Sequence, residues 1–491
     1  MEQYDDIVLG SGISGMTAAL LLASAKRKVL LLERQPFIGG SMRRFKRQGV
    51  SFDTGFHFTG GIGGLLSDML EALGIAGDIQ AVPLDKRQNR IFMEDTGAMY
   101  EFPPGLDAVE AAFHSYFPKE SSAISAYFKT EREIEQETPL MNLRKLNELD
   151  LPLLLQEIDA DKISLHDYLS GINASPVLQS TLAASSLCYG SPPSITALST
   201  HCRIGVGLHR NTDRIKNGGE AFIDAFLKRA AGLDISIKTG TSIASLPRHS
   251  RRFAREAILT DDTAIRFENA IMTIHPKEIA ALIPQEDHEF HGMLNNLEET
   301  ISFNSLFATL DGPSQPLHEL SSCLSSPDLE GILRGGEGCS AMAFLSEAQC
   351  IDKKPVAALC AFSSCSPFLA DQWRGLLNRR RCKEYQEYKE RHSASMLARI
   401  EQIHPEYSGK IRILDSASPL SFIDYLSSSG SAYGIMHRLG DNWLLGRLPF
   451  RNFYIAGQNA MLPGLLGSML SSFIIARYIL GQNFLATTNK P

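Results

Sequence analysis

The stretch that decides the fold runs from Asp6 to Glu33 and reads DIVLGSGISGMTAALLLASAKRKVLLLE. A short apolar run at 6–9 predicts a strand, and an Ala- and Leu-rich run at 16–25 predicts a buried helix. Val29 to Leu32 predicts a second strand, and continuous apolar strands are typical of a parallel sheet covered on both faces. The order strand, glycine-rich turn, helix, strand therefore predicts a Rossmann-type α/β fold.

The glycines of the turn have the spacing of a dinucleotide site. Gly10 allows the sharp turn, Gly12 lets the backbone approach a pyrophosphate, and Gly15 lets the helix pack on the strand. Glu33 ends the second strand, where a carboxylate can bind the ribose hydroxyls of adenosine and disfavours the 2′-phosphate of NADP. The glycine pattern alone is weak evidence, but its strand–helix–strand context and Glu33 make it strong. NAD and FAD both fit these residues.

Later segments predict further strands of the same sheet. The helical pattern at 220–230 is followed by an alternating run at 232–238. Apolar runs also occur at 270–274 and at 453–456, just before Gly457. The nucleotide-binding part is therefore expected to be discontinuous in sequence, whereas 106–208 is mostly helical in pattern and 285–410 mixes turns, strands and a basic helix at 378–399.

Composition narrows the class of protein. The 491 residues carry 48 basic and 55 acidic side chains, a formal net charge of −7, which disfavours nucleic acid as a partner. Eight cysteines without a C-x-x-C pair suit a reducing compartment and offer no metal-ligand spacing. The acidic first residues do not resemble a secretory signal, so we expect a cytoplasmic protein. The uncharged stretch 452–476 contains three glycines and a proline, and is expected to form a strand, a turn and a buried helix rather than a membrane span.

The segment after Glu33 carries a specific resemblance. Arg34 leads into Gly39-Gly40-Ser41, and Phe52-Asp53-Thr54-Gly55-Phe56-His57 follows. This order resembles the FAD-dependent phytoene desaturase, carotenoid isomerase and retinol saturase group within the amine oxidase-like flavoproteins. The resemblance implies FAD, with the Gly-Gly loop along the pyrophosphate and flavin. Because the last cysteine is Cys382, far from the closing motif to which covalent FAD is often attached, the flavin is expected to be non-covalent.

Two further motifs extend the resemblance along the chain. The stretch from Lys216 to Ile243 resembles a segment that contacts the adenine. The run from Tyr454 to Ser468 resembles a closing flavin motif, in which a helix N-terminus stabilises negative charge on the reduced flavin. Together the motifs imply the following cofactor-binding residues: Gly10, Gly12, Ser14, Gly15, Glu33, Arg34, Gly40, Ser41, Ile243, Gly457, Gln458, Gly464, Leu466 and Gly467.

Within the group, the residues around His57 and Gly457-Gln458 are most similar to the retinol saturase branch. Saturation of a polyene needs a hydride and a proton. His57 and Tyr433 are the candidate proton donors on motif position, and for His57 a packing role is an equal alternative. Tyr433 lies in a stretch shared by the saturase and isomerase branches and is expected at or beside the substrate tunnel. No metal site and no nucleophile triad are expected.

These observations define an expected architecture. The fold class is α/β, with a discontinuous Rossmann-type FAD-binding domain and an inserted, mixed α+β substrate domain. The FAD-binding domain is expected over 1–100, 210–284 and 411–491. The substrate-binding, largely helical domain is expected over 101–209 and 285–410.

The expected function follows from the resemblance. It implies an oxidoreductase that saturates, desaturates or isomerises C–C double bonds of a long apolar isoprenoid or polyene by hydride transfer through flavin N5. Two alternatives stay open, a non-covalent FAD amine oxidase acting on C–N bonds and a non-catalytic flavin-binding protein. Since no second nicotinamide motif occurs, an electron carrier or a quinone is an expected partner. Peripheral contact with the inner face of a membrane is an alternative to a purely cytoplasmic location.

Overall fold

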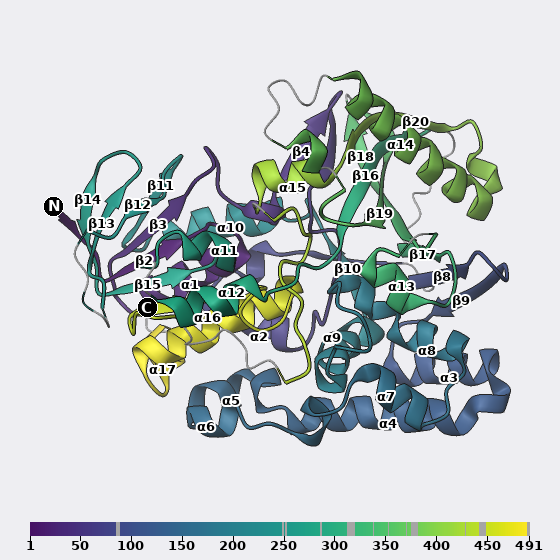
Figure 1. Ribbon diagram of the computed structural model, residues 1–491, viewed down its shortest axis with the longest axis horizontal. Helices are drawn as coiled ribbons and strands as arrows, with labels where there is room; N and C mark the ends of the chain where they lie inside the picture. Colours follow the sequence, from purple (N-terminus) through teal and green to yellow (C-terminus); the bar gives the residue numbers. More distant parts are fainter. Residues whose placement is uncertain are drawn as a thin grey trace.

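The structure is a computed structural model that describes residues 1–84, 89–247, 250, 253–284, 287–311, 320–336, 338–351, 353–369, 371–374, 382–427, 429–440 and 448–488. Its nucleotide-binding part is built on a five-stranded parallel sheet with the order β11-β3-β2-β15-β21 (Figure 1). The strands are β2 (Asp6–Leu9), β3 (Val29–Glu33), β11 (Ile235–Thr239), β15 (Asn269–Met272) and β21 (Phe453–Ile455). The predicted Rossmann-like α/β fold is confirmed, and segments from both ends and the middle of the chain form its sheet.

Two apolar helices pack together beside this sheet. α1 (Ile13–Ser24) is buried at every position after Ile13, and it lies against α16 (Gly464–Leu480). The Ser472 hydroxyl donates to the Ser14 carbonyl over 2.9 Å and also meets the Ser14 hydroxyl at 2.7 Å. Helices buried on all sides are apolar around their whole circumference, which explains the uninterrupted Ala and Leu of the sequence. Other elements of this part are α2 (Leu65–Leu73), α10 (Glu220–Ala230), α11 (Pro276–Ala280), α12 (His288–Asn295), α17 (Phe484–Thr488), and a four-stranded sheet of β1 (Glu2–Gln3), β14 (Ala264–Arg266), β13 (Glu256–Leu259) and β12 (Ile243–Ser245).

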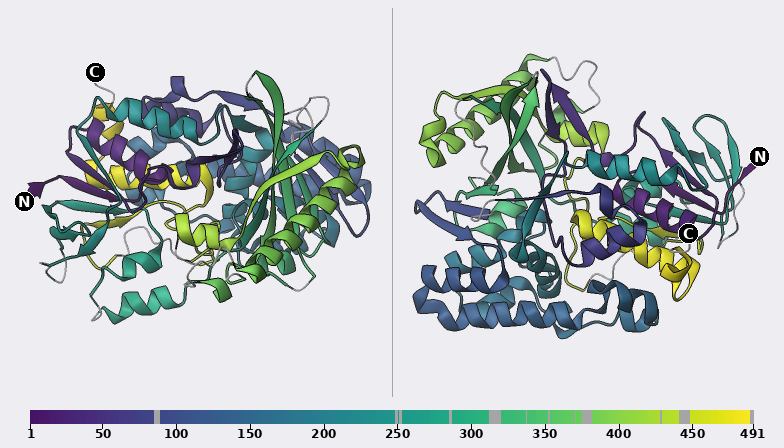
Figure 2. Two further views of the ribbon diagram at one scale, coloured as in Figure 1. Left: turned by 90° about the horizontal axis from the view of Figure 1, so that it is seen from above. Right: turned by 180° about the vertical axis from the view of Figure 1, so that it is seen from behind.

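A second, seven-stranded sheet forms the centre of the other half of the molecule (Figures 1 and 2). Its order is β20 (Ile411–Ala417), β16 (Ser302–Leu310), β19 (Lys354–Cys365), β18 (Ala341–Ile351), β17 (Leu320–Leu324), β8 (Asn89–Met93) and β9 (Ala98–Phe102). Strands β8 and β20, and the first three residues of β9, lie within ranges expected for the FAD-binding domain, yet these strands belong to this sheet. We therefore propose that 89–102 and 411–417 be counted with the substrate domain.

Helices cover the outer sides of the second half. α3 to α9 form the blue layer along the lower edge of Figure 1, in agreement with the helical pattern at 106–208. They are α3 (Leu106–Tyr116), α4 (Ser121–Glu137), α5 (Leu143–Glu148), α6 (Leu151–Leu154), α7 (Leu165–Gly171), α8 (Pro176–Leu182) and α9 (Leu198–Arg210). The remaining helices are α13 (Leu329–Arg334), α14 (Lys383–Ile403) and α15 (Pro419–Tyr425). The basic helix expected at 378–399 corresponds to α14, and residues 378–381 lie outside the described part.

A buried ion cluster ties the two halves together. It joins the hairpin of β4 (Arg44–Arg47) and β5 (Val50–Asp53) to β18, and to β10 (Thr212–Ile215), which pairs with β6 (Thr59–Gly60) and β7 (Ala81–Pro83). Arg214 lies 3.0 Å from Asp53 and 3.6 Å from Glu347, and Arg44 binds the same two carboxylates. These long-range ion pairs fix the hairpin against the second sheet.

The stretch 452–476 forms β21, a turn and most of α16, as the sequence predicts. In the described ranges, no helix has both the length and the apolar character needed to cross a bilayer.

Candidate active site

The glycine-rich turn after β2 forms an anion-binding cradle at the start of α1. The first turn of this helix carries no acidic residue, and no side chain caps it, so its N–H groups are free to meet phosphate oxygens. A Cβ added at Gly12 would meet no atom within 4 Å, whereas one at Gly15 would overlap the carbonyl oxygen of Gly10. Gly15 therefore serves helix packing, and Gly12 keeps the cleft in front of the helix open.

Glu33 lies at the end of β3, with its carboxylate directed at the glycine-rich turn. Its Oε2 accepts from the backbone N–H and the hydroxyl of Ser11, at 3.0 and 2.6 Å, and its Oε1 accepts from the N–H of Gln35 at 2.8 Å. The side chain is held rigidly and is almost buried at 8% exposure. Because a carboxylate oxygen accepts more than one hydrogen bond, Oε1 keeps capacity for a ribose hydroxyl.

A cleft of about 820 Å³ extends from this cradle toward the end of β21. Most residues that the sequence marks for the cofactor line it: Gly10, Gly12, Ser14, Glu33, Arg34, Gly40, Ser41, Ile243, Gly457 and Gln458. Gly15 lies beneath the cradle, and Gly464, Leu466 and Gly467 line a neighbouring cavity. The structure thus brings the three sequence motifs to one elongated cleft. The Arg34 guanidinium is engaged by Glu278 and by the carbonyl of Leu426.

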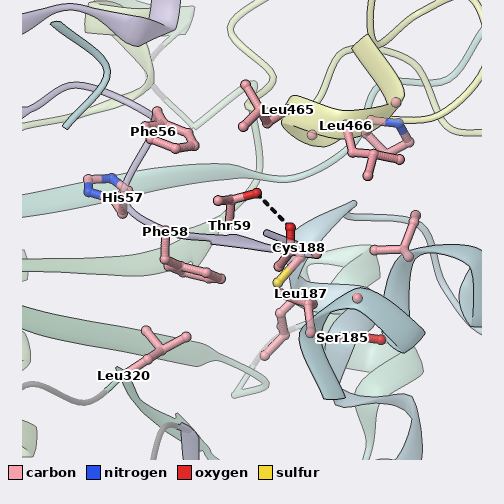
Figure 3. A pocket seen from close by; sticks show the side chains of 18 of the residues that line it. Phe56, His57, Phe58, Thr59, Ser185, Leu187, Cys188, Leu320, Leu465 and Leu466 are labelled. Atoms are coloured by element: carbon pink, nitrogen blue, oxygen red, sulfur yellow. Dashed lines mark hydrogen bonds between the residues drawn. The ribbon is translucent and has the colours of Figure 1, made fainter. Parts of the chain in front are cut away.

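The neighbouring cavity has a volume of about 680 Å³ and adjoins the cleft, since Ser41, Gln458 and Ser468 line both. It lies between the first turn of α16, the segment after β5, α9 and the seven-stranded sheet (Figure 3). Its wall is dominated by apolar side chains, among them Phe56, Phe58, Phe102, Leu182, Leu187, Val206, Phe303, Leu320, Met342, Phe362, Leu465 and Leu466. The arrangement suits an elongated apolar molecule whose one part reaches the dinucleotide cleft.

His57 lines this cavity, but its ring is turned away from Leu466 and Cys188 (Figure 3). The ring stacks on Phe362 with centroids 4.8 Å apart, and its Nδ1 lies 4.0 Å from Asp53. Burial, with the charges of Arg214 and Arg44, lowers the pKa of His57 to about 3, while burial raises the pKa of Asp53 to about 6 against the two arginines. A neutral imidazole is a weak acid, so this geometry favours the packing interpretation over the proton donor.

Tyr433 also lines the cavity, as expected from the motif. Its ring meets Phe303 edge to face, with centroids 5.9 Å apart, and its hydroxyl donates to the carbonyl of Leu187 over 2.9 Å. Burial raises the pKa of Tyr433 well above its usual range. The phenol proton is therefore tightly held and already engaged, and the residue shapes the cavity wall.

Two sets of polar residues at these sites were missed from sequence. Arg43 lines the cofactor cleft with its guanidinium 3.2 Å from the centroid of the Phe37 ring, where a phosphate can meet it. The sequence could have indicated Arg43, because it follows shortly after Gly39-Gly40. Glu131 and His209 form a buried pair beside the apolar cavity, with His209 Nδ1 at 3.0 and 3.1 Å from the two carboxylate oxygens. They are 78 residues apart, so no local pattern could join them.

Comparisons with known proteins agree with this geometry. Residues 8–73 match the family model described as an NAD(P)-binding Rossmann-like domain. The chain is 23% identical to the human all-trans-retinol 13,14-reductase, covering 98% of this chain and 86% of that protein. It is 22% identical to prolycopene isomerase 2 of an Oncidium hybrid, covering 93% and 79%.

Over nearly its whole length the chain is similar to all-trans-retinol 13,14-reductases and prolycopene isomerases. The resemblance expected from the motifs around His57 and Gly457 is thereby confirmed. The relationship extends over nearly the whole chain, including the helical layer α3 to α9, where no motif was recognised. Among solved structures, wild-type putrescine oxidase bound to putrescine superposes with a TM-score of 0.63 at 14% identity. The superposition covers 97% of this chain and 99% of the oxidase. That similarity shows a shared fold.

Proposed function

We propose that this protein is an FAD-dependent oxidoreductase acting on C–C double bonds of a long apolar polyene or isoprenoid. The observation that carries the proposal is the apolar cavity of about 680 Å³ that adjoins the dinucleotide cleft at Ser41 and Gln458. The retinol reductase and prolycopene isomerase among its homologues, both named for polyene substrates, support the same chemistry. Saturation, desaturation and isomerisation are the reactions that the site can host.

The residues present fit a bound FAD. The cradle at Gly12 and the free N–H groups of α1 would receive the pyrophosphate, with Arg43 beside it, and Glu33 would receive the adenosine ribose. α16 begins at Gly464 without an acidic residue in its first turn or a side-chain cap, so its N-terminus favours negative charge nearby. FAD supplies the hydride chemistry, and the protein positions the double bond and excludes water. We also propose that the flavin is non-covalent, because no cysteine is found among the described residues that line the cleft.

The proposal includes an electron donor or acceptor and a membrane surface as partners. Since the sequence carries a single dinucleotide motif, we propose that electrons come from or go to a small carrier, a quinone or another protein. An apolar substrate is stored in lipid, and so we propose a peripheral contact with the inner membrane face for substrate exchange.

The proposal is tested by the visible spectrum of the purified protein and by one anaerobic turnover. We expect a flavin band that denaturation releases into solution. After reduction with dithionite, all-trans-retinol or a carotene should restore the oxidised flavin spectrum and gain two mass units. Absence of flavin after reconstitution with FAD would refute the cofactor assignment. Reduction of the oxidised flavin by small amines, followed by its reoxidation by oxygen with peroxide release, and no reoxidation of the reduced flavin by polyenes, would revive the amine oxidase alternative, which the homologues do not favour.

A further inference from the structure

The Glu131–His209 pair lies at the wall of a predominantly apolar cavity, which His209 lines. Glu131 on α4 is fully buried, and both of its oxygens lie within hydrogen-bond distance of His209 Nδ1 on α9. A carboxylate only accepts hydrogen bonds, so Nδ1 is the nitrogen that donates. This fixes the orientation of the imidazole and leaves Nε2 as its second functional atom.

His209 lines the cavity together with Phe102, whose ring stacks on the imidazole at 6.1 Å and 15°, and Phe128 packs nearby at 5.7 Å. No hydrogen bond to His209 Nε2 is found in the described part of the chain. The same cavity is also lined by Gly464, Leu465 and Leu466 in the first turn of α16, and so it extends from His209 to the cofactor side.

The other polar groups around the pair are neutral or already bound. Tyr127 donates to Glu131 over 3.5 Å and lies 3.0 Å from His201. Burial raises the pKa of Tyr127 well above its usual range and lowers the pKa of His201 to about 3, so both stay uncharged. Arg203 on α9 is engaged by Asp161 and by the hydroxyl of Thr138.

A route to solvent lies one helical turn away. Glu135 follows Glu131 by four residues on α4 and therefore shares its face. It pairs with Arg210 over 2.6 Å, lines the same cavity, and is partly exposed. Burial raises the pKa of Glu135 against the effect of Arg210, which eases its protonation.

We propose that His209, held by Glu131, is the proton donor for polyene reduction in this cavity; the inference rests on the proposed function. In the step, one carbon of the double bond would receive the hydride that a reduced flavin supplies. The other carbon would take the proton from Nε2 of the imidazolium form of His209, so that this N–H bond breaks and the neutral imidazole remains, with its Nδ1–H still donated to Glu131. The substrate is reduced by two electrons, the flavin is oxidised by two, and a low-potential reductant such as dithionite reloads it. Water returns the proton by way of Glu135.

The test compares single turnovers of the reduced holoenzyme with all-trans-retinol or a carotene in H₂O and D₂O. In D₂O the product should carry one deuteron at each of the two reacting carbons, because the N–H groups of the reduced flavin and of His209 both take their hydrogen from the solvent. We expect H209Q to reoxidise its flavin about 10²- to 10⁴-fold more slowly, the range of general acid catalysis, with unchanged flavin content and unchanged polyene binding. The matched control is H404Q, because His404 binds Glu406 at 2.9 Å in a similar pair but lines neither cavity. It should keep the rate of the unmodified protein.

A spectroscopic readout separates the pair from a purely structural role. In oxidised holoenzyme with ¹⁵N-labelled histidine, the Nδ1–H signal of His209, assigned by its loss in H209Q, should shift in E131Q and persist in H404Q. E131Q keeps the imidazole and should turn over at least tenfold more slowly. If H209Q fails to bind flavin, the turnover rate of E131Q tests the inference in its place.

The outcomes are distinct. A normal rate in H209Q, or in E131Q where H209Q is not flavin-loaded, overturns this inference and leaves the proposed function standing. A product without solvent deuterium does the same. If the unmodified protein reduces none of the polyenes but desaturates or isomerises one of them, this inference alone falls. If it does none of the three, the proposed function falls as well.

Discussion

His57 lies between the ring of Phe362 and the charged side chains of Arg214, Arg44 and Asp53. These neighbours set the charge of His57, and of them only Asp53 is close to His57 in sequence. The same holds for Tyr433, whose hydroxyl is fixed by a carbonyl 246 residues away. Motif position placed Tyr433 at or beside the substrate tunnel and left His57 open between a proton donor and a packing residue, and both residues line the cavity. It could not predict the direction of a ring or the partner of a hydroxyl, because these depend on contacts that only the tertiary structure creates.

The low pKa of His57 makes a prediction about stability and pH. In the unfolded chain the imidazole takes up a proton below pH 6.5, whereas in the folded protein it stays neutral down to about pH 3. Stability from this group is therefore present above pH 6.5 and is lost as the pH falls toward 3. Between pH 6.5 and 5, the unfolding free energy should drop by about 2 kcal/mol more in the unmodified protein than in H57Q. Urea denaturation at both pH values measures the two unfolding free energies. An equal drop between pH 6.5 and pH 5 in the unmodified protein and in H57Q would contradict the prediction.

At the scale of elements, the glycine-rich turn and the first turn of α1 were predictable from sequence because the constraints are local. Strands β2 and β3 begin at Asp6 and Val29, where their apolar runs predict, and the predicted helix at 220–230 is α10. The edges of the two domains were not predictable. Strands β8, β9 and β20 resemble any short strand in sequence, and only their pairing shows that they belong to the seven-stranded sheet.

Two glycines of the turn provide a matched pair of variants. G15A should disrupt folding, because its methyl group would overlap the carbonyl oxygen of Gly10 and push α1 off the sheet. G12A should fold normally, since its methyl meets no protein atom within 4 Å and the backbone at Gly12 is not left-handed. Its methyl group instead enters the phosphate cradle, so flavin affinity should fall at least tenfold. Thermal unfolding without cofactor and flavin titration measure the two effects; normal flavin binding by G12A would contradict the cradle.

At the scale of the whole molecule, the ion cluster of Arg44, Asp53, Arg214 and Glu347 holds the two halves in one arrangement. Replacing Arg214 by Met removes one partner and leaves the buried carboxylate of Asp53 and the half-buried carboxylate of Glu347 with Arg44 alone. We expect R214M to lower the unfolding free energy by about 3–5 kcal/mol. The control is R144M, whose exposed partner Glu148 should make it nearly neutral, within about 0.5 kcal/mol. Similar stabilities of the two variants in urea denaturation would show that the cluster does not join the halves.

The packing of α1 against α16 has a consequence for how the chain is made. α1 leaves the ribosome roughly 440 residues before α16, and the face of α1 that packs on α16 lacks this partner during that time. At about 5–20 residues per second, the delay is roughly 20–90 s. Nascent chains must therefore carry an uncovered apolar helix face through most of their synthesis, which is the kind of surface that molecular chaperones shield. Translation speed and chaperone supply, rather than the stability of the finished protein, should set how much of it accumulates in a cell.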